Sequence, residues 1–225
     1  MHYDGWVLRF NGGYTRRANS VNLIGPSSLP IEVKIQYCED AYRAARQYTV
    51  FKLFTDPEAE NLDRKLALLG YKTEGHTDVM IRPLSRLDLD RAMDIRVETE
   101  LTDRWLNAAA ELNEIDTRHR SRLEHILRNI RPHHGFASVR IGGETVSVGL
   151  SVVERGWLGI FDIVTAKSHR RQGFGRSLVN NMMEWGHQHG AANAYLQVMT
   201  NNISAINLYR SLGFVSEYSY WYRTQ

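Results

Sequence analysis

The spacing of apolar residues divides the first part of the chain into alternating strand and helix candidates. Short apolar runs predict strands at residues 6–10 and 49–54, and a longer alternating run predicts another at 72–82. Apolar positions recur at helical spacing over residues 31–46 and 61–69. Gly12 and Gly13 break the first run, so residues 14–23 are expected to supply its hairpin partner.

The pattern changes after Pro83. Residues 84–131 carry almost no strand signal, and their apolar positions predict helices; residues 132–135 end this block. Strands are then expected at residues 136–141, 145–153 and 157–164, with Gly142 and Gly143 joining the first two. A helix ending at Gly190, a strand at 194–199, a helix capped by Asn202 and an aromatic-rich strand at 214–223 complete the prediction.

A basic, glycine-containing turn joins the apolar strand 157–164 to the following helix. Its sequence is Arg170-Arg171-Gln172-Gly173-Phe174-Gly175-Arg176. Glycines let the backbone approach a ligand closely, and a helix beginning here directs unpaired N–H groups and the positive end of its dipole at an anion. Because arginines add donors for phosphate oxygens, we interpret the turn as a pyrophosphate site.

Two motifs in this order resemble the GNAT superfamily of acyl-CoA-dependent N-acetyltransferases. The first is the Arg170-x-x-Gly173-x-Gly175 turn, and the second runs from Asn202 through Ala205 and Tyr209 to Leu212-Gly213-Phe214. The resemblance covers about residues 136–223. It implies an α/β (α+β) fold in which helices flank a mixed, mostly antiparallel, splayed sheet.

The first part of the chain contains a weaker copy of the same unit. Leu69-Gly70-Tyr71 matches Leu212-Gly213-Phe214, but this copy lacks the glycine turn, and Leu66 stands where the second copy has Tyr209. The resemblance therefore divides the chain into a partial, degenerate GNAT-like domain at residues 1–83 and a catalytic GNAT domain at 84–225, as in tandem GNAT proteins. Chance similarity is the alternative.

The resemblance also assigns roles at the site. Main-chain groups of Ile163, Val164 and Thr165 would meet the pantetheine arm and thioester of acetyl-CoA. The turn residues Arg170, Arg171, Gln172, Gly173, Phe174, Gly175 and Arg176 would wrap the pyrophosphate. Asn202 would contact the cofactor or only cap its helix. Tyr209 would protonate the departing thiolate, or else be an ordinary core tyrosine on the apolar stripe of its helix.

The chemistry of acetyl transfer agrees with these roles. An N–H donor near the carbonyl oxygen stabilises the negative charge that develops there. A phenol with a pKa of about 10 can give its proton to a thiolate whose conjugate acid has a pKa of about 8.5. The base that deprotonates the amine stays open between Glu154, Asp162 and ordered water. Both carboxylates also have structural interpretations, as a hydrogen-bonding group for Asp162 and an exposed charge for Glu154.

Composition narrows the class of protein further. The chain has 225 residues, one cysteine and a net charge of +3, which suits an anionic ligand. With Cys38 alone no internal disulfide can form, and no apolar run spans a bilayer, so a cytoplasmic protein without membrane contact is expected. No histidine cluster has a convincing metal-ligand set, so no metal is expected. The basic segment with Arg118, Arg120, Arg122, Arg128 and Arg131 is interpreted as a solvated face, and nucleic acid is not an expected partner.

Together these observations predict an N-acetyltransferase. It would move the acetyl group of acetyl-CoA, by direct attack, to a primary amine of a small molecule, amino acid or peptide, with Tyr209 as general acid. The alternative is a non-catalytic acyl-CoA-binding or protein-interaction module, which the degenerate first copy suggests. The amine and the choice between monomer and homodimer stay open.

Overall fold

The computed structural model describes residues 1–13, 15–85 and 95–225, which form two compact units. The first comprises Met1–Asp78, Met199–Asn201 and Tyr218–Gln225, and the second comprises Val79–Val198 and Asn202–Glu217. Three strands, β5 (Lys72–Pro83), β10 (Asn193–Met199) and β11 (Val215–Thr224), contribute residues to both units. The expected boundary after residue 83 is therefore replaced by a division in which C-terminal residues complete the first unit.

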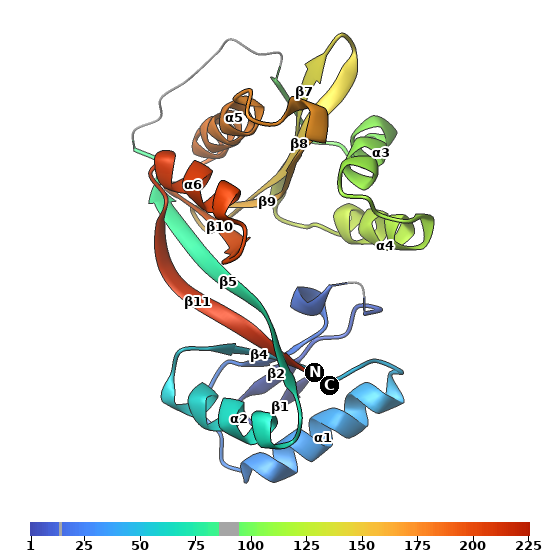
Figure 1. The fold of residues 1–225 in the computed structure, drawn as a ribbon, viewed down its shortest axis with the longest axis vertical. Coiled ribbons are helices and arrows are strands. Elements are labelled where there is room, and N and C mark those ends of the chain that lie inside the picture. The colour runs from blue at the N-terminus through green and yellow to red at the C-terminus, as the bar shows by residue number, and fades with distance from the viewer. Residues whose placement is uncertain (14, 86–94) are drawn as a thin grey trace. The chain divides into compact units, whose positions relative to one another are not determined.

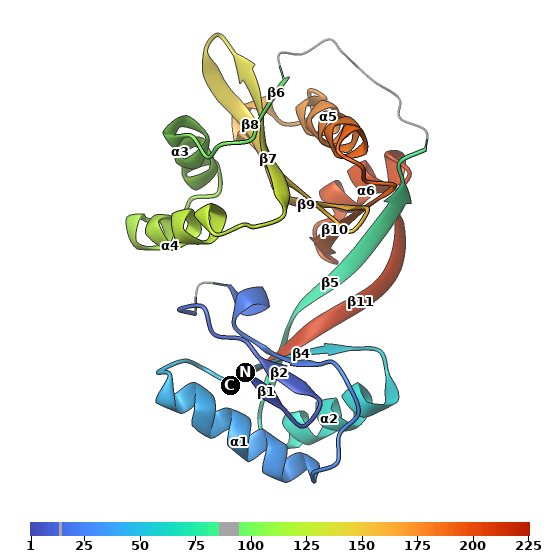
Figure 2. The same cartoon turned by 180° about the vertical axis from the view of Figure 1, so that it is seen from behind.

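The first unit places two helices against a short-stranded sheet. Its elements are β1 (His2–Tyr3), β2 (Trp6–Leu8), a 3₁₀ helix (Arg16–Ala18), β3 (Val21–Leu23), α1 (Ile31–Ala44), β4 (Val50–Phe54), α2 (Pro57–Leu68) and the first part of β5. Their strand order is β1-β2-β3-β4-β11-β5, so β11 lies in the interior of this sheet. Helices α1 and α2 cover one face, and the 3₁₀ helix lies on the other (Figures 1 and 2).

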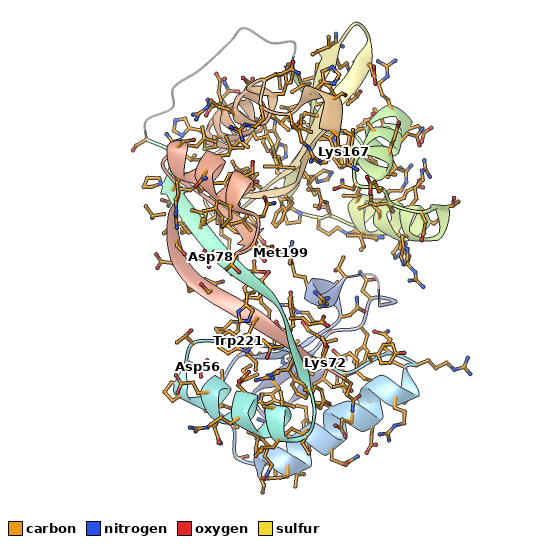
Figure 3. The ribbon with its side chains drawn as sticks, viewed as in Figure 1. Asp56, Lys72, Asp78, Lys167, Met199 and Trp221 are labelled. Atoms are coloured by element: carbon orange, nitrogen blue, oxygen red, sulfur yellow. The ribbon has the colours of Figure 1, made fainter. Side chains whose placement is uncertain are left out.

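Side-chain chemistry explains why the first unit holds together. Its core is built from apolar residues of both helices and the strands beneath them, among them Trp6, Tyr42 and Phe51, which are fully buried. Asp56 caps α2 by accepting a hydrogen bond from the Ala59 N–H at 2.9 Å. Trp221 of β11, labelled in Figure 3, packs against this core.

The second unit is a mixed, mostly antiparallel sheet with helices packed on it, as the sequence predicts. Its further elements are β6 (Ile95–Glu98), α3 (Asp103–Leu112), α4 (Thr117–Arg128), β7 (His133–Ile141), β8 (Glu144–Glu154), β9 (Trp157–Thr165), a 3₁₀ helix (Lys167–His169), α5 (Phe174–Gln188), β10 (Asn193–Met199) and α6 (Ile203–Ser211). The strand order after β5 is β10-β9-β8-β7-β6. Strands β9 and β10 are parallel, whereas β8 is antiparallel to both of its neighbours.

Several local predictions differ from the structure; for example, α2 begins at Pro57 rather than at residue 61, because Asp56 caps it. A strand, β6, interrupts the supposed helical block at 84–131; it is too short to be recognised alone and forms by pairing with β7 while Ile95 and Val97 pack on the core. Residues 86–94 of that block lie outside the described residues. Strand β7 begins at His133, inside the supposed break, because its first residues pair with β8. Residue 14 of the expected hairpin partner at 14–23 lies outside the described residues, and of residues 15–23 only 21–23 form a strand, since Thr15 caps a 3₁₀ helix instead.

Candidate functional site

The backbone between β9 and α5 turns sharply at two residues with positive φ. Arg171 has φ +64° and Gly173, the residue before α5, has φ +88°. Glycine adopts this left-handed conformation without steric penalty, which lets α5 begin directly after the turn. The first N–H groups of α5, from Phe174 onward, have no partner within the helix and form the positive end of its dipole.

Basic side chains surround this helix start. The Arg170 Nε donates to the Thr165 carbonyl at 3.2 Å, which fixes that arginine beside the end of β9. Arg176 reaches from α5 to α6, where its Nη2 donates to the Ser211 hydroxyl at 2.6 Å. Arg171 is exposed. Lys167, labelled in Figure 3, pairs with Glu114 at the start of the same connection.

The end of β9, the turn and α6 enclose a cavity of about 810 Å³. Most of the predicted cofactor-binding residues line it, namely Ile163, Val164, Thr165, Arg170, Arg171, Gly173, Phe174, Gly175, Arg176 and Asn202. The predicted acid, Tyr209, lines it too. Gln172 does not; its side-chain amide donates to the Ser168 carbonyl at 3.2 Å and so stays within the turn.

Gly175 lines this cavity, and the packing of the protein does not explain why this residue is a glycine. A Cβ at this position would lie 3.4 Å from Leu208 Cδ2 and 3.7 Å from Thr165 Oγ1, which are ordinary van der Waals distances. The protein could therefore accommodate alanine here. A missing side chain at a helix start that faces a cavity leaves room for a group approaching the backbone N–H donors.

Strand β9 carries a bulge at the point where it reaches the cavity. Val148 pairs with Val164, whereas Leu150 pairs with Phe161, so β9 has one more residue than β8 between these pairs. Asp162 lies in the bulge with φ +51°. The parallel register of β9 with β10 ends at Ile160 and Leu196, just before the bulge. A bulge redirects the main-chain groups of the strand, here those of the cavity-lining residues that follow.

Tyr209 is held by its helix with its ring almost fully buried, 8% exposed, against Phe214. The residues around Tyr209 on α6 are arranged at the spacing of an α-helix. The ring centroids of Tyr209 and Phe214 are 6.1 Å apart. Burial raises the pKa of Tyr209 to about 12, because the apolar surroundings disfavour the phenolate. The phenol therefore keeps its proton at neutral pH.

Asn202 does what the sequence predicts of a capping residue. Its side-chain oxygen accepts a hydrogen bond from the Ala205 N–H at 3.2 Å, at the start of α6. Asn202 also lines the cavity. The cap and a ligand contact are compatible, because the side chain lies at the edge of the cavity and caps through one oxygen.

The two carboxylates proposed as bases do not line the cavity. Glu154 pairs with Trp157 at the far end of β9, and the seven steps from Trp157 to Val164 correspond to roughly 23 Å of strand. Its position does not support a role as the base. Asp162 precedes the lining residue Ile163 but is itself exposed and is not part of the lining.

Several lining residues were missed by sequence reasoning. They are His169 in the 3₁₀ helix and the α6 residues Ser204, Ala205, Asn207, Leu208 and Ser211. The helical spacing of Ser204, Leu208 and Ser211 puts them on one face, so the periodicity of α6 could have identified them once Asn202 was assigned to the cavity.

Neither a metal centre nor a membrane-spanning helix is found in the part of the chain that the structure describes. No group of three or more metal-ligating side chains gathers among residues 1–13, 15–85 and 95–225. Within those same ranges, no helix has the length and apolar character needed to cross a bilayer.

Comparison with known proteins identifies relatives along nearly the whole chain. Residues 1–223 match the protein family described as "Probable histone acetyltransferase Rv0428c C-terminal". The uncharacterized N-acetyltransferase YobR of Bacillus subtilis (strain 168) is 27% identical over 221 residues, which cover 96% of this chain and 88% of that protein.

Solved structures share the fold at lower sequence identity. A GCN5-related N-acetyltransferase from Kribbella flavida superposes with a TM-score of 0.72 at 15% identity, over 100% of this chain and 88% of that one. A tandem GNAT protein from the clavulanic acid biosynthesis pathway superposes with a TM-score of 0.65 at 16% identity, over 91% of this chain and 75% of that one.

Proposed function

This chain belongs to the family described as "Probable histone acetyltransferase Rv0428c C-terminal" and is a GNAT-type N-acetyltransferase, and we propose that it transfers the acetyl group of acetyl-CoA to a primary amine. The observation that carries the proposal is one cavity of the second unit. This cavity is lined by the end of the bulged strand β9, by the start of α5, where Gly173 makes the turn, and by Tyr209, which is buried and protonated. The acceptor belongs to a small molecule, an amino acid or a peptide.

The helix start and its arginines fit the phosphates of acetyl-CoA. Residues at the start of α5, where N–H groups have no partner within the helix, line the cavity, and a Cβ at Gly175 would meet only ordinary contacts. Arg171 and Arg176 add charge at the same end. Bound there, acetyl-CoA supplies an acetyl group on a thioester, which an amine can attack.

The end of β9 orients the reacting groups. Ile163, Val164 and Thr165 line the cavity beyond the point where the pairing of β9 with β10 ends, and we infer that their main-chain groups face it. N–H groups fixed in a strand need no reorganisation to stabilise an oxygen that gains negative charge. The pantetheine arm would lie along this strand end, with the thioester carbonyl toward its donors.

Tyr209 acts as the general acid. When the amine forms its bond to the acetyl carbon, the bond from that carbon to sulfur breaks, and the phenol gives its proton to the departing thiolate. The high pKa of Tyr209 keeps that proton available, and the desolvated phenolate is reprotonated by solvent after each turnover. Water takes the proton of the amine, since Glu154 is remote and Asp162 lies outside the lining.

Replacement of Tyr209 by phenylalanine tests this proposal. With an amine panel and acetyl-CoA, we expect thiol release by Tyr209→Phe to fall about tenfold or more in kcat, within the range that general acid catalysis contributes. The dissociation constant for CoA should be unchanged, because the ring stays in place. An unchanged kcat would remove Tyr209 from the mechanism, and the absence of acetyl transfer to any amine by the wild type would contradict the proposed reaction.

A further inference from the structure

The sheet of the first unit has a second face, opposite the one that α1 and α2 cover. Phe51 and Leu53 of β4 point into the core beneath α1 and α2, so the residue between them, Lys52, points to the opposite face. Tyr222 of β11 lies directly opposite Lys52 in the antiparallel register and shares that face. The 3₁₀ helix Arg16–Ala18 lies on this side of the sheet as well (Figures 1 and 2).

Lys52 is half-buried on this face without an acidic partner. Its ammonium nitrogen lies 3.7 Å from the centre of the Tyr220 ring and 5.9 Å from that of Phe54. In the described ranges it forms neither an ion pair nor a hydrogen bond, yet it is not among the buried polar atoms that lack a partner. The side chain of Lys52 is partly exposed to solvent.

Lys34, a second lysine of this unit, is buried and has oxygen partners for its ammonium group. The Lys34 ammonium donates to the Asp4 carbonyl at 2.7 Å and to the Ser27 hydroxyl, and lies 3.4 Å from an Asp4 carboxylate oxygen. These oxygens replace the water that burial removes. Lys52 has aromatic rings in place of such oxygens, so an oxygen ligand would improve its surroundings.

The groups nearest to Lys52 add positive charge. Arg9 and Arg17 lie close enough to lower the pKa of Lys52, and together with burial they bring it to about 8. Arg9 donates to the Arg17 carbonyl at 3.5 Å, and no carboxylate of the described chain pairs with either guanidinium. Only Arg16 has an acid, Glu74, at 2.7 Å. Three cations thus share one face without a negative charge to balance them.

We propose that Lys52, Arg17 and Arg9 bind an oxyanion, a phosphate or carboxylate group of a ligand, on the sheet face of the first unit opposite α1 and α2. Such a group would take up the three unneutralised charges at once and accept hydrogen bonds from both arginines. A nucleic acid is disfavoured as the ligand, because Tyr220 and Tyr222 are only 2% and 5% exposed and offer no ring face for stacking bases.

A titration that observes Lys52 itself tests the proposal. The protein is labelled with [13C]lysine, the Lys52 side-chain signal is assigned by its loss in Lys52→Met, and inorganic phosphate and acetate are added in separate series. We expect a saturable shift of the Lys52 signal and a rise in its pKa. The rise follows from linkage, because the anion favours the charged lysine.

Variants distinguish this site from others. Arg17→Gln should weaken binding about tenfold, since one charge-assisted donor is lost, and this exposed position leaves folding intact. Arg43→Gln, an exposed arginine of α1 paired with Asp40, should leave binding unchanged. The titration is repeated in Arg171→Gln, because phosphate also finds donors in the second unit, and the Lys52 response should persist there.

The outcomes separate cleanly. Tighter binding of phosphate than of acetate would support a phosphate-bearing ligand, and comparable binding would support a carboxylate. A shift that does not saturate, or one of equal size and affinity in Arg17→Gln, would overturn the site. Neither result bears on acetyl transfer, which is measured separately through Tyr209.

Discussion

Gly173 and Gly175 stand two residues apart but serve different needs. Gly173 has φ +88°, a conformation that costs an L-residue roughly 1–2 kcal/mol. Gly175 has no such constraint, and a Cβ there would meet only ordinary contacts. The first glycine therefore serves the backbone, and we infer that the second serves the ligand.

Alanine substitutions at these two positions should separate folding from binding. Gly175→Ala should leave the unfolding temperature unchanged or slightly raised, because alanine in a helix is favoured over glycine by about 0.5–1 kcal/mol. Its affinity for CoA should fall about fivefold, or ~1 kcal/mol, as measured by calorimetric titration. Gly173→Ala should lower the unfolding temperature instead. Equal CoA affinity in wild type and Gly175→Ala would contradict a ligand-facing role.

The buried phenol of Tyr209 predicts a particular pH dependence. Because the pKa of Tyr209 is raised to about 12, the acid stays protonated throughout the range in which most enzymes are assayed. The ratio of kcat between wild type and Tyr209→Phe should therefore stay constant from pH 7 to about 9.5, in buffers of matched ionic strength. A ratio that falls toward one as the pH rises would indicate a phenol that ionises in this range.

At the level of single residues, the sequence named residues that the structure brings together at one cavity, but it did not give the geometry there. The turn with Gly173 and the helix with Tyr209 carry local patterns, and both line the cavity. The bulge at Asp162 has no such signal, because it arises from a register difference between β8 and β9. Glu154 could have been set aside from chain order, because it precedes β9 whereas the glycine turn follows the other end of that strand.

Elements of the first unit are connected by one network of charged and polar groups. Arg223 of β11 donates to both carboxylate oxygens of Asp63 on α2, at 2.8 and 2.7 Å, and also to the Tyr71 carbonyl at 3.0 Å. The Trp221 indole donates to Asp63 at 2.7 Å. The hydrogen bonds from Arg223 are the main reason why the pKa of Asp63 is lowered.

Removal of the Asp63 charge should destabilise the protein in a pH-dependent manner. At pH 7 we expect Asp63→Asn to lower the free energy of unfolding, measured by urea denaturation, by about 1–3 kcal/mol. Since the folded pKa of Asp63 lies below its unfolded value, this stabilisation is complete above about pH 4 and is lost as the pH falls through the folded pKa. The difference between wild type and variant should shrink over that window.

A matched exposed ion pair provides the control for this experiment. Asp40 and Arg43 on α1 are 57% and 69% exposed, so Asp40→Asn should change the free energy of unfolding by less than about 0.5 kcal/mol. A comparable loss in both variants would mean that the effect of Asp63 is not specific to its partly buried network.

Long periodic elements were predicted well, and short ones formed by pairing were not. Helix α5 was predicted from its apolar stripe, which packs on the core of the second unit. Strand β6 has two apolar residues, Ile95 and Val97, and gains its structure from β7. The sequence could not show this, because the partner strand lies distant in the chain.

At the scale of the whole molecule, the two units share strands, although most residues of the first unit precede those of the second along the chain. Strand β11 lies between β4 and β5 in the strand order, so the first unit has an interior strand from the end of the sequence. The glycines after α2 and α6 also match: Gly70 has φ +86° and Gly213 φ +84°, each leading into one of the shared strands. This likeness supports the proposal that the first unit is a degenerate copy of the second.

The shared strand predicts that residues 1–83 do not fold alone. Without β11, this fragment lacks the partner of β4 and the arginine that pairs with Asp63. We expect no cooperative thermal unfolding by circular dichroism. The same fragment joined to residues 215–225 through a flexible linker should recover a cooperative transition. Cooperative unfolding of residues 1–83 alone, at the temperature of the joined fragment, would contradict this prediction.

The interior place of β11 also bears on biosynthesis. A ribosome adding about 5–20 residues per second needs roughly 7–30 s to pass from the end of β5 to the end of β11. Throughout that time β4 and β5 are exposed to the cell without the strand that separates them, and unpaired strand edges invite association with other nascent chains. A stop codon anywhere before residue 218 would therefore leave the first-made part of the protein, rather than the last, without one of its interior strands.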